Sequence, residues 1–267
     1  MAHNRNRALT VLYELADRYN ADCNPPVSVG TGDGSGEGVA QEEEVPVVLI
    51  TQFYAPADAA LSRDVTEALE INLRNPAISE VLLLTERYFD FSALPFAHKV
   101  RQRVIGARLT FADAFRSANS AYRNWHVIIA NADICFDETL AIVTRADLEG
   151  RVLALSKWKR KRGGAGGRPS TGGTDRLLLV LRTESQDAWL FRSPIREGVI
   201  LKSRFNLGAV RCDNRLAKVL KEENYEVVGP VFAVHAIENE ERVKNVVYDF
   251  EHAVPGEGAP VFLSLIV

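Results

Sequence analysis

The chain has 267 residues, a formal net charge of -3 at pH 7 and a hydrophobic fraction of 46%. This length suits one large α/β domain, whose core is big enough to fold without disulfide or metal staples. The near-neutral charge excludes a strongly basic or acidic binding protein, so we predict no nucleic-acid partner.

The three cysteines, Cys23, Cys135 and Cys212, are widely spaced and form no CxxC pair. This pattern excludes a disulfide framework, argues against structural zinc and favours reduced thiols in the cytoplasm. No apolar run reaches the length of about 18 residues that predicts a transmembrane helix. The polar start at 1–10 lacks the apolar core of a signal peptide, although an anchor trimmed from a longer natural chain would leave no trace here.

The chain divides by composition into a structured body and polar ends. Apolar residues at helical spacing predict a short helix within 1–23, and the Gly-rich, acidic segment 24–45 is typical of a flexible linker. We expect one α/β domain over 46–254 and a C-terminal tail at 255–267. Within the domain, the basic and Gly-rich segment 159–175 predicts a mobile surface loop.

Strands and helices are expected to alternate along the domain. Apolar runs predict strands at 45–53, 78–85, 99–109, 125–130, 151–158, 176–181 and 225–228, and a short strand or turn at 186–191. Helical spacing predicts a helix between Ser62 and Pro76, capped by Ser62 or Asp64, and further helices at 111–124 and 213–220. Such alternation is typical of a mostly parallel sheet with right-handed crossovers.

The clearest candidate site is Asn131-Ala132-Asp133, directly after the apolar strand at 125–130. Ligands of open parallel sheets bind outside the carboxyl ends of the strands. A carboxylate there, together with a diphosphate, offers the oxygen ligands that Mg²⁺ or Mn²⁺ prefers. An Asx turn in which the Asp caps the next helix explains the same residues equally well.

Three further residues are candidates with structural alternatives. Asp187, beside the apolar Trp189, has the surroundings that raise a carboxyl pKa and produce a general base, but it also suits an ordinary surface position. Asp213 is typical of a helix N-cap, and Gly208 before it permits close backbone approach. His235 at a strand end is a structural residue unless it meets Asp133 in space.

These strings occur in one order: the first strand, NADI-FD, RVLALSKW, SQDAWLF, LGAVRCDNRLA and PVFAVHAIENEER. Their combination, over about residues 46–245, resembles glycosyltransferases of GT-A fold, in particular the small chlorella-virus and algal type. The resemblance implies a single Rossmann-like α/β domain. It also implies transfer of a sugar, with inversion, from a nucleotide-diphosphate donor, favouring a UDP-sugar, to a hydroxyl of a glycan, lipid or protein.

The resemblance also assigns roles to residues of this chain. Asp187 is the implied catalytic base. Asp133 and His235 are the implied ligands of Mn²⁺ or Mg²⁺. The implied nucleotide-sugar residues are Thr51, Gln52, Phe53, Arg108, Asp113, Asn131 and Ala132. The implied acceptor side consists of Trp189, Asp213 and Asn214.

Two departures from the family pattern keep alternatives open. Asn131 replaces the first acid of the DxD-like motif, and Ile237 stands where relatives tend to carry a second His. Both reduce the number of metal ligands, so a catalytically degenerate module that binds a nucleotide sugar or a partner is one alternative. A nucleotidyltransferase is another, but the segment 51–64 has no glycine and therefore no Gly-rich phosphate loop.

Overall fold

The structure is a computed structural model that describes residues 44–161, 176–180, 186–230 and 233–239, with Val254, Gly258, Leu263 and Ser264. The predicted N-terminal helix lies outside the described residues. So do most of the predicted linker, most of the basic loop and most of the C-terminal tail.

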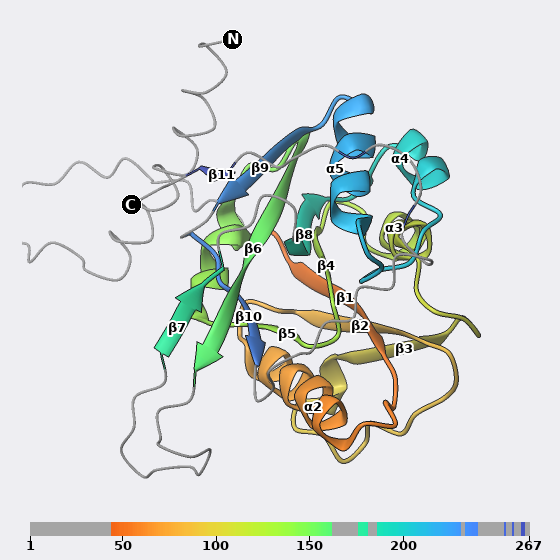
Figure 1. Cartoon of the computed structure of the whole chain (residues 1–267), viewed down its shortest axis with the longest axis vertical. Coiled ribbons are helices and arrows are strands. Elements are labelled where there is room, and N and C mark those ends of the chain that lie inside the picture. Colours follow the sequence, from red (N-terminus) through yellow and green to blue (C-terminus); the bar gives the residue numbers. More distant parts are fainter. Residues whose placement is uncertain are drawn as a thin grey trace, which may run out of the picture.

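One mixed sheet forms the centre of the domain, with the strand order β11-β9-β6-β8-β4-β1-β2-β3 (Figure 1). Its strands are β1 Val47–Phe53, β2 Glu80–Thr85, β3 Val100–Val104, β4 His126–Ala130, β6 Arg151–Lys161, β8 Gln186–Arg192, β9 Glu226–Pro230 and β11 Leu263–Ser264. Three more, β5 Ile134–Phe136, β7 Arg176–Leu179 and β10 Ala236–Asn239, pair off this path. Strands β1 to β4 are mutually parallel, whereas β8 runs antiparallel to β4 and β6. The predicted α/β class with a mostly parallel central sheet is confirmed.

Helices cover both faces of this sheet. They are α2 Ala59–Arg74, α3 Phe111–Ala121, α4 Glu197–Lys202 and α5 Cys212–Glu222, with 3-10 turns η1 Ala97–Lys99 and η2 Glu138–Arg145. Side chains alternate along β1, so that Val48 and Ile50 join the core under α3, α4 and α5, while Val47 and Leu49 join the core under α2 and η2. A strand buried on both faces has to be apolar throughout, which explains the continuous apolar run of β1.

The strand order reverses between β1 and β4. The chain leaves β1 through α2 to reach β2 and β3 on one side, then crosses through α3 to β4 on the other side. Because α2 and α3 cover opposite faces, this is the doubly wound, Rossmann-like arrangement. In such sheets a ligand crevice opens at the carboxyl ends of the strands where the order reverses, here at the ends of β1 and β4.

Two predicted helix caps are wrong. The side chain of Asp58 caps α2 and accepts hydrogen bonds from the backbone N–H groups of Ala60 at 2.8 Å and Leu61 at 3.3 Å. The helix therefore starts before Ser62 and Asp64, the two predicted caps. Arg211, in the left-handed region with φ 68°, precedes α5, and Asp213 lies inside its first turn rather than at the cap.

Several element boundaries also differ from prediction. Strand β6 continues through Lys159 to Lys161 because β7 and β10 pair with it, so the predicted loop does not begin at 159. The short elements β5, α4 and β10 were not predicted, since three to six residues carry too little periodicity. No helix in the described part of the chain is long and apolar enough to cross a membrane.

Candidate active site

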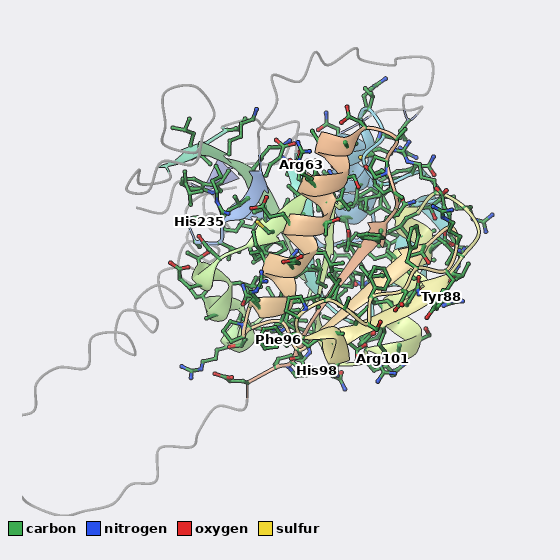
Figure 2. All side chains as sticks on the ribbon, turned by 90° about the horizontal axis from the view of Figure 1, so that it is seen from below. Arg63, Tyr88, Phe96, His98, Arg101 and His235 are labelled. Carbon is green, nitrogen blue, oxygen red and sulfur yellow. The ribbon has the colours of Figure 1, made fainter. Side chains whose placement is uncertain are left out.

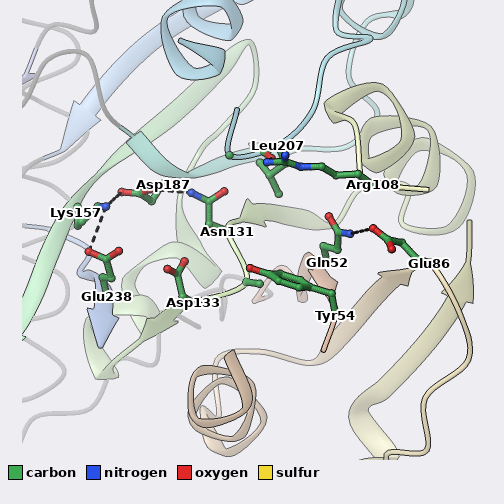
Figure 3. Close-up of a pocket in the computed structure, with 12 residues that line it drawn as sticks. Gln52, Tyr54, Glu86, Arg108, Asn131, Asp133, Lys157, Asp187, Leu207 and Glu238 are labelled. Atoms are coloured by element: carbon green, nitrogen blue, oxygen red, sulfur yellow. Dashed lines mark hydrogen bonds and ion pairs between the residues drawn. The ribbon is translucent and has the colours of Figure 1, made fainter. Parts of the chain in front are cut away.

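A pocket of about 450 Å³ opens where β1 and β4 end (Figure 3). It is lined by Gln52, Tyr54, Glu86, Arg108, Asn131, Ala132, Asp133, Lys157, Asp187, Leu207, Gly208 and Glu238. The parallel pairing of β1 with β4 brings the residues after each strand to one edge, which places Tyr54 beside the segment that begins at Asn131. The predicted strand-end location of the site is therefore where the structure has its crevice.

Asp187 reaches this pocket through a β-bulge. The pairing of β6 with β8 passes from Leu155–Ala188 to Ser156–Gln186, which leaves Asp187 as the extra residue of β8. A bulge redirects a side chain out of the regular alternation of the strand. Because β8 runs antiparallel to β4, its first residues lie beside the last residues of β4, and the backbone N–H of Asn131 donates to the carbonyl of Asp187 at 3.0 Å.

Both carboxylate oxygens of Asp187 have partners. The Nδ2 of Asn131 donates to Oδ1 at 2.8 Å, and the Nζ of Lys157 lies 3.1 Å from Oδ2. The same ammonium lies 3.3 Å from Oε2 of Glu238, whose side chain is 3% exposed. A single lysine therefore bridges two buried acids at this end of the pocket and offsets one of their two negative charges (Figure 3).

The acids of this region are electrostatically coupled. Burial raises the pKa of Asp187 above its usual value, and Asp133 and Glu238 raise it further, while Lys157 opposes the rise. Burial and then the charge of Asp187 raise the pKa of Asp213 to about 8. Asp213 does not line the pocket, but it approaches Asp187 from the start of α5 and interacts with the backbone N–H of Gln186. A buried acid with a raised pKa is a candidate proton acceptor near neutral pH.

The opposite end of the pocket is built around Gln52. Its Oε1 accepts the backbone N–H of Leu109 at 3.1 Å, so its Nε2 is directed to Oε1 of Glu86 at 3.3 Å. Figure 3 shows Gln52 and Glu86 at one end, Lys157 and Glu238 at the other, and Tyr54 between them.

Arg108 and Gly208 form the wall opposite Tyr54. The guanidinium of Arg108 donates to the carbonyl of Leu207 at 3.0 Å. Gly208 has φ +68°, and a Cβ at this position would lie 3.3 Å from Oδ1 of Asn131 and 3.7 Å from the Arg108 guanidinium. A glycine here keeps the backbone close to both groups and leaves their polar atoms accessible from the pocket.

The structure brings some of the predicted nucleotide-sugar residues together and not others. Those that line the pocket are Gln52, Arg108, Asn131 and Ala132. Thr51 instead ties β1 to β4 through a 2.8 Å hydrogen bond to the carbonyl of Ala130. Phe53 packs edge-to-face on Phe89 and Phe91, with ring centroids 5.1 and 5.0 Å away. Asp113 accepts from the hydroxyl of Thr110, the N-cap residue of α3, at 2.6 Å.

Of the other predicted residues, Asp133 and Asp187 line the pocket. Trp189 belongs to the core, 1% exposed, and Asn214 lies on α5 beside Gly258, outside the pocket lining. The structure does not bring His235 together with Asp133. The Nδ1 of His235 lies 2.8 Å from Oδ2 of Asp137, and its ring packs on Trp158 with centroids 4.4 Å apart. His235 lies on the β10 side of the molecule (Figure 2) and does not line the pocket.

The sequence arguments missed several pocket residues: Tyr54, Glu86, Lys157, Leu207 and Glu238. Tyr54 and Glu86 follow directly after β1 and β2, so the strand-end rule that selected Asn131 also applies to them. Lys157 and Glu238 carried no such signal. Their meeting depends on the pairing of β10 with β6 and on the alternation that directs Lys157 and Trp158 to opposite sides.

A metal ion at this site would take most of its coordinating atoms from a bound substrate rather than from the protein. Among the described residues, no group of three or more His, Cys, Asp or Glu side chains is arranged to hold one. Lys157 is shared by Asp187 and Glu238, whereas Asp133 lines the pocket at the carboxyl end of β4, which makes Asp133 the candidate carboxylate for a cation. Mg²⁺ is commonly bound by one or two carboxylates plus substrate phosphates, so the residues fit a diphosphate-borne ion.

The fold and the pocket together define an α/β protein of Rossmann-like architecture with a pocket lined by polar residues at its switch point. No protein-family model matches the sequence, and the search of curated proteins gives no match. One similar solved structure is the mannosyltransferase PcManGT from Pyrobaculum calidifontis in complex with GDP-Man and Mn²⁺ (TM-score 0.47, 16% identity, 90% of this chain and 68% of that chain). Another is 4-diphosphocytidyl-2C-methyl-D-erythritol synthase (TM-score 0.40, 14% identity, 70% of this chain and 87% of that chain). Similarity of this size identifies neither a substrate nor an activity.

Proposed function

We propose that the chain is a glycosyltransferase that moves a sugar from a nucleoside-diphosphate donor to a hydroxyl acceptor. The observation that carries this proposal is Asp187, a buried carboxylate that a β-bulge brings into an open pocket between Asn131 and Lys157. Asp133 lines the same pocket, at the carboxyl end of β4. A proton acceptor and a separate carboxylate for a cation are the two groups that a metal-dependent, inverting transfer uses.

In the proposed reaction, Asp187 takes the proton from the acceptor hydroxyl as the oxygen attacks the anomeric carbon. A new carbon–oxygen bond forms on one face, the bond to the diphosphate breaks on the other, and its electron pair leaves with the diphosphate, so the anomeric centre is inverted. Burial raises the pKa of Asp187, which makes it a stronger proton acceptor than a solvated Asp. General base catalysis of this kind contributes roughly 10²–10⁴-fold.

The departing diphosphate needs positive charge, and this chain offers Arg108 in the pocket wall. Arginine suits this role because its planar fork of donors matches phosphate oxygens. Asp133 is the proposed protein ligand of Mg²⁺ or Mn²⁺, which when bound would supply further charge for the leaving group. His235, bound to Asp137, is not included in the proposed metal site.

The nucleotidyltransferase alternative is disfavoured by the start of α2. A phosphate loop after the first strand uses the free N–H groups of the following helix. Here the carboxylate of Asp58 occupies those groups at Ala60 and Leu61, and its charge repels a phosphate.

A module that binds a nucleotide sugar without turnover is favoured by one observation. Oδ1 of Asp187 accepts from Asn131 and Oδ2 lies 3.1 Å from the ammonium of Lys157, and both contacts stabilise the ionised carboxylate against taking up a proton. The Asp187→Asn variant separates this module from a transferase. A transferase keeps donor binding and loses turnover in the variant, whereas a binding module shows no turnover in either protein.

The first experiment is titration calorimetry of nucleoside diphosphates with and without Mn²⁺, on the wild type and on Asp133→Asn. We expect Mn²⁺ to strengthen nucleotide binding by the wild type. In Asp133→Asn, we expect Mn²⁺ to leave the nucleotide affinity unchanged. Release of the diphosphate from nucleotide sugars, with water as acceptor, then reports turnover. Glu138→Asn is a matched control, since Glu138 is exposed at the start of η2 and outside the pocket lining. Absence of any nucleotide binding would overturn the proposed donor site.

A further inference from the structure

Glu86 places a carboxylate in a pocket proposed to bind an anionic ligand. It follows β2 directly and lies at the end of the pocket opposite Lys157 and Glu238 (Figure 3). Within the described residues its only hydrogen-bond partner is Nε2 of Gln52, and no Lys or Arg pairs with it. The neighbouring Arg87 instead lies over the ring of Phe89, 5.1 Å from its centroid.

The position of this carboxylate is held by Gln52. Gln52 is 9% exposed, and its Oε1 is committed to the backbone N–H of Leu109. The amide can therefore present only its NH₂ group to Glu86, at 3.3 Å. An ionised carboxylate is acceptor-only, so Glu86 offers its remaining lone pairs to N–H or O–H donors of a ligand.

The order of groups along the pocket indicates which part of a nucleotide-sugar substrate would contact Glu86. If the sugar lies at Asp187 and the diphosphate at Asp133, the ribose comes next and the base reaches the far end. That end contains the Gln52–Glu86 pair, and next to it, toward the middle of the pocket, the ring of Tyr54 offers a surface on which a base can stack. This placement rests on the proposed function.

We propose that Glu86 recognises guanine, so that the donor is a GDP-sugar. Guanine alone among the common bases presents two adjacent donors, N1–H and the 2-amino group, on its Watson–Crick edge. A carboxylate accepts both side by side, whereas uracil presents one N–H between two carbonyl oxygens, which a carboxylate repels. Cytosine and adenine present an amino group next to a ring-nitrogen acceptor, and this pattern also leaves one carboxylate oxygen facing a lone pair.

The test is titration calorimetry of the full chain with Mn²⁺, using GDP, IDP, UDP and 2′-deoxy-GDP on the wild type and Glu86→Gln. In the wild type, GDP should bind more tightly than UDP, and also more tightly than IDP, which lacks the 2-amino group. Loss of a charge-assisted hydrogen bond typically lowers affinity about 10–100-fold. In Glu86→Gln we expect that loss for GDP and 2′-deoxy-GDP, which share the guanine base, a smaller loss for IDP, which keeps only N1–H, and none for UDP. The variant should gain affinity for xanthosine diphosphate, whose C2 carbonyl accepts from the new amide.

The control is Glu70→Gln, the same change at an α2 glutamate that pairs with Arg74 outside the pocket lining. It should leave every affinity unchanged. UDP binding at least as tightly as GDP in the wild type would overturn the guanine assignment and leave the proposed function standing. So would an equal loss for all nucleotides in Glu86→Gln accompanied by weak binding of 2′-deoxy-GDP, because Glu86 would then recognise the ribose. If no nucleotide binds the wild type, the proposed function itself fails.

Discussion

The Nζ of Lys157 lies 3.1 Å from Oδ2 of Asp187, and the two side chains are 18% and 10% exposed. The same ammonium also pairs with Glu238, so one positive charge is shared by two acids that face the pocket. Removing one partner of a buried pair leaves an uncompensated charge, which costs far more than the pair contributes. Lys157 therefore connects the stability of the domain with the protonation of its proposed base.

Lys157→Met should lower the free energy of unfolding by about 3–5 kcal/mol at pH 7, measured by urea denaturation. The loss should shrink as the pH falls, because protonation of Asp187 and Glu238 relieves the uncompensated charge. Lys202→Met is the control, since Lys202 is 43% exposed in its pairs with Glu222 and Glu223, and exposed pairs contribute about 0–1 kcal/mol. Equal small losses in both variants would show that Lys157 is not buried in the pair described. Lys157→Arg keeps the charge and serves if the Met variant does not fold.

Gly208→Ala and Gly106→Ala separate backbone strain from pocket contact. Both glycines have positive φ, +68° and +73°, so each substitution should destabilise the protein by about 1–2 kcal/mol. Only at Gly208 does the new methyl meet a pocket group, Oδ1 of Asn131 at 3.3 Å, while at Gly106 nothing lies within 4 Å. Calorimetry should therefore find weaker nucleotide binding in Gly208→Ala alone. Similar affinities in both variants would contradict the described contact.

Asp213→Asn should change the pH dependence of stability. Burial raises the pKa of Asp213 to about 8, above its value in the unfolded chain. Between about pH 4 and 8 the folded state binds the extra proton, so this group stabilises the fold fully below the unfolded pKa and loses that contribution as pH rises through 8. Asp213→Asn does not titrate and so does not lose this stability as the pH rises. The urea midpoint of the variant minus that of the wild type should therefore increase from pH 5 to pH 8. A constant difference over that range would show that Asp213 titrates normally.

Asp58→Ala tests the start of α2. Loss of this N-cap should lower the free energy of unfolding by about 1 kcal/mol, because the N–H groups of Ala60 and Leu61 lose their acceptor. Nucleotide affinity should stay the same if the diphosphate lies at Arg108 and Asp133. Tighter binding in the variant would indicate that phosphates approach the α2 N-terminus and would favour the nucleotidyltransferase alternative.

The local pattern of the sequence determined much of the fold. The strands β1, β2 and β4 are buried on both faces and therefore read as apolar runs, so they and the α/β class were predictable. The same pattern located Asn131 and Asp133 at a strand end, where parallel sheets bind ligands. The proposed role of Asp187 as the catalytic base rests on the family resemblance, because a short string beside Trp189 has no distinctive spacing.

Only the tertiary structure decided how the pocket is composed. Lys157 reaches Asp187 and Glu238 through strand pairing between distant segments, and a one-residue bulge on β8 directs Asp187 into the pocket. The antiparallel pairing of β10 with β5, in which Ala236 lies opposite Phe136, brings His235 to Asp137, away from the pocket lining. Register and bulges depend on contacts across the whole sheet, and a one-residue shift turns a side chain to the other face. For this protein, apolar patterning determined which segments form the sheet, and strand register determined which polar side chains share its crevice.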